Sequence, residues 1–140
     1  ISNYVARMMV MVLSHLKRRP EFLRVANKGL KAVAPGLVLQ ALDRDDENAD
    51  IRVGFTTTRR IGNAVARNRA RRRLRAVARE IMPSNATPGH DYVLIGRAAT
   101  KSRPYDALTR DLAGTLKRLG LLIRPEHSSS TSEDKTQKKS

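Results

Sequence analysis

The residues of this sequence that could do chemistry are mainly arginines, and they are concentrated in one stretch. Nine arginines occur between Arg59 and Arg79, and no Asp or Glu interrupts them before Glu80. The arginine side chain is planar and weakly hydrated, and it binds phosphate oxygens through two parallel hydrogen bonds. Like charges four residues apart destabilise a helix by roughly 0.2–0.5 kcal/mol, so folding alone does not explain such a row. The pattern therefore predicts a polyanion-binding surface.

The composition of the whole chain agrees with a nucleic acid as that polyanion. The formal net charge is +15 and the pI is about 11.3. Such an excess repels itself in the folded state, which favours a phosphate-rich partner. A chain that is merely soluble and basic would share this composition, so the hypothesis depends on the arginine pattern more than on the total charge.

Groups that could catalyse a reaction on their own are not evident. Acidic residues cluster only in 43–50, which lacks the glycine and distal Glu of a calcium loop and is typical of a solvated hairpin. His15, His90 and His127 show no metal-ligand spacing, and the chain has no cysteine. We therefore expect no catalytic residue, no metal held by the protein alone and no small-molecule substrate.

The N-terminal apolar run does not indicate a membrane segment. Val5 to Leu16 is shorter than the roughly 20 residues that span a bilayer, and its basic residues follow it rather than precede it. We predict that residues 1–15 are a leader or extended N-terminus, that 16–125 form the domain and that 126–140 are a disordered tail. With no cysteine and no membrane partner, the protein is expected to be cytoplasmic.

Hydrophobic periodicity predicts an α/β (α+β) two-layer sandwich with three helices and about four strands. Predicted helices cover 20–27, 64–81 and 105–119, and predicted strands cover 37–42, 52–58 and 91–96. Asn63 should cap the second helix, which should end before Pro83. In that helix one apolar stripe should pack on the sheet, namely Ala66, Ala70, Leu74, Val77 and Ile81.

The order of residues around the arginines is more specific than their charge. The stretch RVGFTTTRRIGNAVARNRARRRLRAVAR, residues 52–79, closely resembles the bacterial ribonuclease P protein subunit, whose hallmark is Gly-Asn-Ala-Val followed by Arg-Asn-Arg. The segments DYVLIGR, residues 91–97, and PEFLRV, residues 20–25, are similar to that family's next strand and first helix. The resemblance covers roughly residues 16–122.

The resemblance implies a fold and a role. The fold would be a ribosomal-protein-like sandwich with a left-handed βαβ crossover, against the usual right-handed rule. The role would be that of an accessory subunit, inactive alone. It would bind the ribonuclease P RNA subunit and the 5′ leader of precursor tRNA, while the RNA, with bound Mg²⁺, hydrolyses the phosphodiester that releases the leader.

The resemblance also assigns site residues. Those that match the block contacting the RNA subunit are Arg67, Asn68, Arg69, Arg71, Arg72 and Arg75. Those that match the leader-binding cleft and its mouth are Phe22, Phe55, Arg59 and Arg60. Phe22 and Phe55 also fit plain core positions. Where some family members have further cleft aromatics, this chain has Ala26 and Gln40, so its cleft should depend more on charge than on stacking.

Two other functions stay open on the sequence. A non-enzymatic ribosomal or RNA-chaperone protein of similar fold would also carry a basic helix on a sheet. A DNA-binding regulator would place that helix in a major groove, but such regulators usually dimerise, and no dimerisation stripe is visible.

Overall fold

The structure is a computed structural model and describes residues 13–123. The predictions for residues 1–12, for the tail 126–140 and for His127 lie outside this range. In chain order the elements are β1 (Leu13–His15), α2 (Arg19–Lys28), β2 (Leu30–Val33), β3 (Leu37–Asp43), β4 (Ile51–Thr57), η1 (Arg59–Ile61), α3 (Ala64–Asn85), β5 (His90–Gly96), η2 (Ala98–Lys101) and α4 (Tyr105–Arg118).

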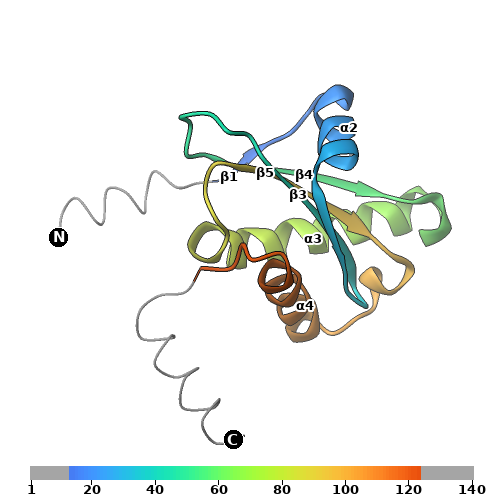
Figure 1. The fold of residues 1–140 in the computed structure, drawn as a ribbon. Coiled ribbons are helices and arrows are strands. Elements are labelled where there is room, and N and C mark those ends of the chain that lie inside the picture. The colour runs from blue at the N-terminus through green and yellow to red at the C-terminus, as the bar shows by residue number, and fades with distance from the viewer. Residues whose placement is uncertain (1–12, 124–140) are drawn as a thin grey trace, which may run out of the picture.

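Five strands form one mixed sheet in the order β1-β4-β5-β3-β2 (Figure 1). β4 is parallel to both of its neighbours, β1 and β5, whereas β3 is antiparallel to β5 and β2. The parallel pair β4 and β5 is joined through α3, which makes the expected βαβ crossover; its left-handedness stays a prediction. Buried and less buried side chains alternate along β3, as expected for a strand with one face fully covered and the other only partly covered.

The sheet has one strand more than the four expected, and the domain begins earlier than residue 16. β1 pairs with β4 in the register Leu13 to Ile51, so residues 13–15 belong to the fold rather than to a leader. β2 is an edge strand with a single buried residue, Ala32. Neither segment shows period-2 alternation over enough residues to be recognised as a strand.

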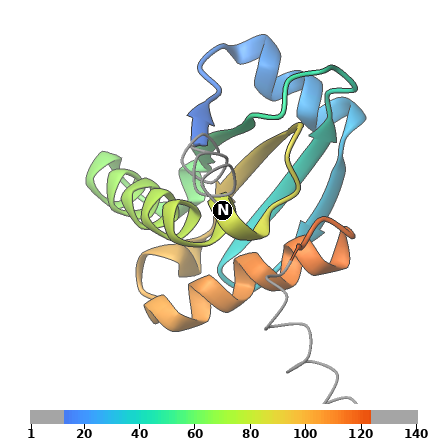
Figure 2. The same ribbon diagram turned by 90° about the vertical axis from the view of Figure 1, so that its left-hand side faces the viewer.

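Helices cover the two faces of the sheet unequally (Figures 1 and 2). α3 and α4 lie on one face and enclose the main core, whose largest buried side chains include Tyr92, Leu74 and Leu108. α2 lies on the opposite face, where Val25 packs with Leu16 and Val93 in a smaller cluster. The sandwich therefore has a partial third layer, and α2 leaves part of its face of the sheet open.

The boundaries of α3 match the prediction at its start but not at its end. The Asn63 side chain accepts a hydrogen bond from the amide of Ala66 at 2.9 Å, as a cap should. The helix then continues through Pro83 to Asn85, so the expected stop at Ile81 is wrong. Met82 is fully buried, and its carbonyl accepts from the amide of Ala86 at 3.0 Å. This packing holds the last turn despite the lost proline donor.

Candidate RNA interface

The exposed side of α3 carries a shallow hollow lined mainly by arginines, which we call the arginine face. Its volume is about 430 Å³, and its lining residues are Val65, Asn68, Arg71, Arg72 and Arg75. Their spacing of three, four and seven residues places them on one side of a helix whose opposite side, Ala70, Leu74 and Val77, is fully buried. Within residues 13–123 no carboxylate lines this hollow, so the only charges that an anion meets in this lining are positive.

Asn68 orders one arginine of this face. Its side-chain oxygen accepts from Arg71 at 2.6 Å, and the same guanidinium donates to the Thr57 hydroxyl at 3.2 Å. An arginine held in place loses less entropy when it binds phosphate. The asparagine of the Arg-Asn-Arg order therefore acts through Arg71 in this structure.

Three other arginines of α3 donate to backbone carbonyls of the protein. Arg67 donates to the carbonyl of Gly62 at 2.6 Å, and Arg69 donates to that of Lys101 at 3.2 Å. Arg73 is not among the RNA contacts that the family resemblance assigns. It donates to the carbonyls of Thr100 and Arg103 at 2.9 and 2.6 Å. Of the six predicted RNA-subunit contacts, Asn68, Arg71, Arg72 and Arg75 share the hollow, whereas Arg67 and Arg69 lie outside its lining.

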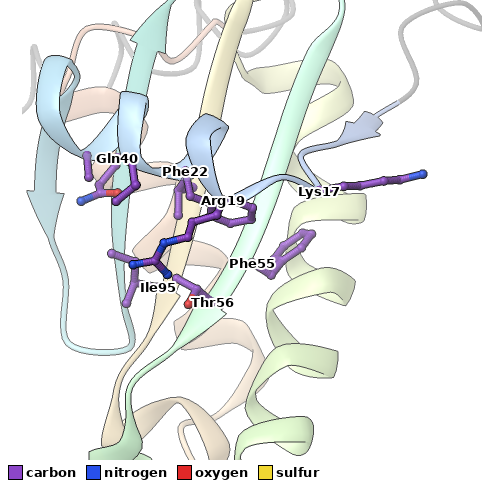
Figure 3. A pocket seen from close by; sticks show the side chains of 10 residues that line it. Lys17, Arg19, Phe22, Gln40, Phe55, Thr56 and Ile95 are labelled. Atoms are coloured by element: carbon purple, nitrogen blue, oxygen red, sulfur yellow. The ribbon is translucent and has the colours of Figure 1, made fainter.

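A second concave surface, the α2 cleft, lies between α2 and the open part of the sheet (Figure 3). Its volume is about 480 Å³. The floor and wall combine apolar and polar side chains from four elements, and the complete lining is Lys17, Arg19, Phe22, Leu23, Ala26, Gln40, Phe55, Thr56, Val93 and Ile95. The cleft therefore contains both predicted phenylalanines and both positions where the sequence lacks an aromatic.

The two phenylalanines stand on opposite faces of β4. Phe22 packs on the α2 face, over Gly54, where a side chain would collide with its ring. Phe55 alternates with Gly54 and packs against the main core on the α3 face, where the Cζ atom of Arg75 lies 5.7 Å from its ring centroid. Both are therefore core residues as well as cleft residues, and Phe55 reaches the cleft only at its edge.

The charged residues of the cleft differ from those predicted. Lys17 and Arg19 line it. In the sequence, the position of these basic residues after the apolar run indicates only that the run is not a signal peptide. Arg59 and Arg60 are exposed in η1, at the end of β4. Arg60 lines a neighbouring hollow that shares Ile95 with the cleft, whereas Arg59 lines neither of them.

An ion network fixes the start of α2 on the sheet. Asp91 is buried and accepts from Arg44 at 3.0 Å and from Arg52 at 2.7 Å, and Arg52 also lies 3.6 Å from Glu21. Burial raises the pKa of Asp91, but the hydrogen bonds from Arg52 and Arg44 outweigh it and keep that pKa below its ordinary value. Because Glu21 directly precedes Phe22, this network helps to position the cleft.

The expectation that the acidic segment 43–50 is a solvated hairpin is wrong, because β5 lies between β3 and β4 in the sheet. Arg44 is buried within this segment and donates to the carbonyls of Asn48, Asp50 and His90 at 2.7, 2.9 and 3.0 Å. The prediction treated the segment by its average composition and so missed the one cation around which it folds. Within residues 13–123, no three His, Cys, Asp or Glu residues are grouped so that they could hold a metal ion. No helix in that range has the length and hydrophobicity to cross a membrane.

Comparison with known proteins relates the chain to one family. The ribonuclease P family model matches residues 12–120. The ribonuclease P protein component of Paramagnetospirillum magneticum is 51% identical over 113 residues, which cover 79% of this chain and 85% of that protein. The corresponding protein of Gluconacetobacter diazotrophicus is 52% identical over 106 residues, covering 76% of this chain and 90% of that protein.

Solved structures show the same fold at lower identity. The RNase P protein of Staphylococcus aureus aligns with a TM-score of 0.65 at 22% identity, over 78% of this chain and 97% of that one. The RNase P protein of Thermotoga maritima gives a TM-score of 0.64 at 22% identity, over 80% and 99% of the two chains. At 22% identity, this structural similarity establishes the fold alone.

Proposed function

Because this chain belongs to the ribonuclease P protein family, we propose that its two concave surfaces divide the work of that enzyme between them. The chain is a protein component of ribonuclease P, which takes part in tRNA processing. In the proposed division, the arginine face binds the RNA subunit, and the α2 cleft binds the 5′ leader of precursor tRNA. The holoenzyme then removes the leader in the cytoplasm by hydrolysing one phosphodiester bond.

The observation that carries the RNA-subunit contact is the set of uncompensated guanidinium groups on α3. Arg72 and Arg75 are exposed, and within residues 13–123 their side chains have neither a carboxylate partner nor a hydrogen bond. Lys and Arg that neutralise phosphates release counterions, which gives affinity for an RNA backbone without sequence readout. A rigid helix anchored on the sheet holds these charges at fixed spacing, so it suits a folded RNA better than a flexible strand.

The α2 cleft suits a single strand. Phe22 offers a ring for a base, Lys17 and Arg19 offer charge for the backbone, and Gln40 and Thr56 offer hydrogen-bonding groups on the floor. Base stacking and a basic groove are the usual combination for binding single-stranded nucleic acid. The chemistry belongs to the RNA subunit, whose bound Mg²⁺ would activate water and stabilise the leaving oxygen. The protein residues orient the leader and lower the repulsion between the two RNAs.

Reconstitution tests this division of labour. The protein alone should not cleave precursor tRNA, but it should restore cleavage by its RNA subunit at low Mg²⁺ concentration. Cleavage by the pure protein would contradict the proposal. If the protein instead bound ribosomal RNA with equal affinity and left the turnover of the RNA subunit unchanged, the alternative of a ribosomal or RNA-chaperone protein would be favoured.

A further inference from the structure

A third concavity, the edge hollow, lies on the α3 face beside β1. Its volume is about 270 Å³, and it is lined by Leu13, His15, Phe55, Arg75, Arg79 and Pro83. It shares Phe55 with the α2 cleft and Arg75 with the arginine face. The edge hollow is therefore the place where the two proposed RNA surfaces meet, around the edge of the sheet.

Phe55 is accessible there because β1 is short. β1 ends at His15, which pairs with Val53, so among residues 13–123 β4 has no neighbouring strand on that side beyond this point. The ring of Phe55 is partly exposed and lies between two side chains, with the His15 ring centroid at 6.3 Å and the Cζ atom of Arg75 at 5.7 Å. Aromatic rings and guanidinium planes side by side are groups on which a nucleobase stacks.

The rim of the edge hollow is positively charged. Arg75 and Arg79 are four residues apart on α3 and exposed, and within residues 13–123 neither has an ion pair or a side-chain hydrogen bond. Two cations and a ring surface match the phosphate and the base of a nucleotide.

We propose that the edge hollow is a second subsite for the single-stranded leader, which takes a nucleotide beyond those held in the α2 cleft. The phosphate lies between Arg75 and Arg79, and the base lies against the rings of His15 and Phe55. This inference rests on the proposed function of the cleft. The leader is favoured over the RNA subunit because His15 and Phe55 offer rings for an unpaired base, as Phe22 does in the cleft, whereas the lining of the arginine face contains no ring.

Leader length provides the test. Holoenzymes reconstituted with wild-type, Arg79→Ala or His15→Ala protein bind precursor tRNAs that differ only in leaders extended one nucleotide at a time. Wild-type affinity should rise in two stages, as the leader fills first the cleft and then the hollow. Each variant should lose the second stage, with affinity for long leaders about tenfold weaker, the size expected for one stacked or phosphate-bound nucleotide, and with affinity for short leaders unchanged.

The controls separate the possible outcomes. Arg110→Ala removes an equally exposed cation from α4 and should change neither stage. Unfolding midpoints of the free proteins show whether the variants fold, and Arg79→Lys should recover part of the long-leader affinity. The proposal would be overturned if the variants lost the same affinity for every leader length, or if they lost none. It would also be overturned if they were impaired only in assembly with the RNA subunit. If wild-type protein bound long and short leaders equally, the cleft proposal itself would fail.

Discussion

The ring of Phe22 lies on the α carbon of Gly54, so closely that a β carbon at this glycine would come within 2.5 Å of Cε2 of the ring. Residue 54 must therefore be small, because α2 packs directly on β4. This contact sets how closely α2 approaches the sheet and so determines the depth of the α2 cleft. The ring is held against β4 and β5, and its free face remains available to the cleft.

Gly54→Ala should consequently weaken both the fold and leader binding. The added methyl group must displace Phe22, and overpacking of this kind costs about 1–3 kcal/mol. Chemical denaturation measures that loss, and the affinity for precursor tRNA should fall only for substrates that carry a leader. Gly114→Ala is the matched control, because nothing lies within 4 Å of its added carbon in α4. It should stabilise the helix by about 0.5–1 kcal/mol. Equal effects of the two changes would contradict this contact.

Two neighbouring arginines of α3 should behave differently. Arg72 is exposed on the arginine face, so Arg72→Ala should leave the free energy of unfolding nearly unchanged and reduce the salt slope of RNA-subunit binding by about 0.7–0.9. Arg73 donates to two carbonyls between α3 and α4, so Arg73→Ala should cost about 1–3 kcal/mol of stability. Its salt slope should match that of the wild type. Denaturation measures the free energy of unfolding, and binding at several salt concentrations measures the salt slope. If Arg73→Ala changed the salt slope and Arg72→Ala did not, the RNA contact would lie on the Arg73 side of α3.

Asp91 should make stability depend on acid pH. Its pKa is depressed in the folded state, so the stabilisation is complete above about pH 4, where an unfolded Asp is ionised. This stabilisation is lost as the pH falls through the lowered pKa of Asp91 in the folded protein. Asp91→Asn removes the buried charge partner of Arg44 and leaves it only the half-exposed Asp46, which should cost about 3 kcal/mol at neutral pH and flatten the acid limb. Unfolding measured from neutral to acid pH tests this, with exposed Glu47→Gln as the control. An unaltered acid limb in Asp91→Asn would contradict the assignment.

The α2 cleft should gain affinity from an added ring. Ala26 lines it, whereas its neighbour Asn27 is exposed on α2 outside the lining. Ala26→Phe provides a stacking surface that can contribute about 1–3 kcal/mol for one base, so precursor tRNA with a leader should bind roughly tenfold more tightly. Asn27→Phe adds the same ring outside the cleft and should leave the affinity unchanged. A gain from both variants would indicate nonspecific stacking.

The arginine face could be predicted almost entirely from the sequence, because a helix converts spacing directly into geometry. Ala70, Leu74 and Val77 are fully buried as the apolar stripe predicted, and Asn63 caps the helix. The division of the arginines was less visible. The helix period turns Arg73 about 100° away from Arg72, but whether that direction meets carbonyls or solvent depends on where η2 and α4 pack.

The cleft shows the limit of sequence reasoning more clearly. Phe22 and Phe55 were assigned together by resemblance, but residue parity on β4 puts Phe55 on the face opposite to Phe22. Likewise, Lys17 and Arg19 reach the cleft only because β1 joins the sheet and the chain then turns into α2. Three residues of β1 are too few to produce a periodic signal.

The sequence by itself determined the charge of this protein, the helix that displays it and the family to which it belongs, because these depend on residue types and on local spacing. Tertiary structure alone decided which arginines are free, how Arg44 and Arg52 hold Asp91, and where the cleft meets the edge hollow. The physical reason is that these relations join residues far apart in the chain, and their distances follow from strand order and packing rather than from any period in the sequence.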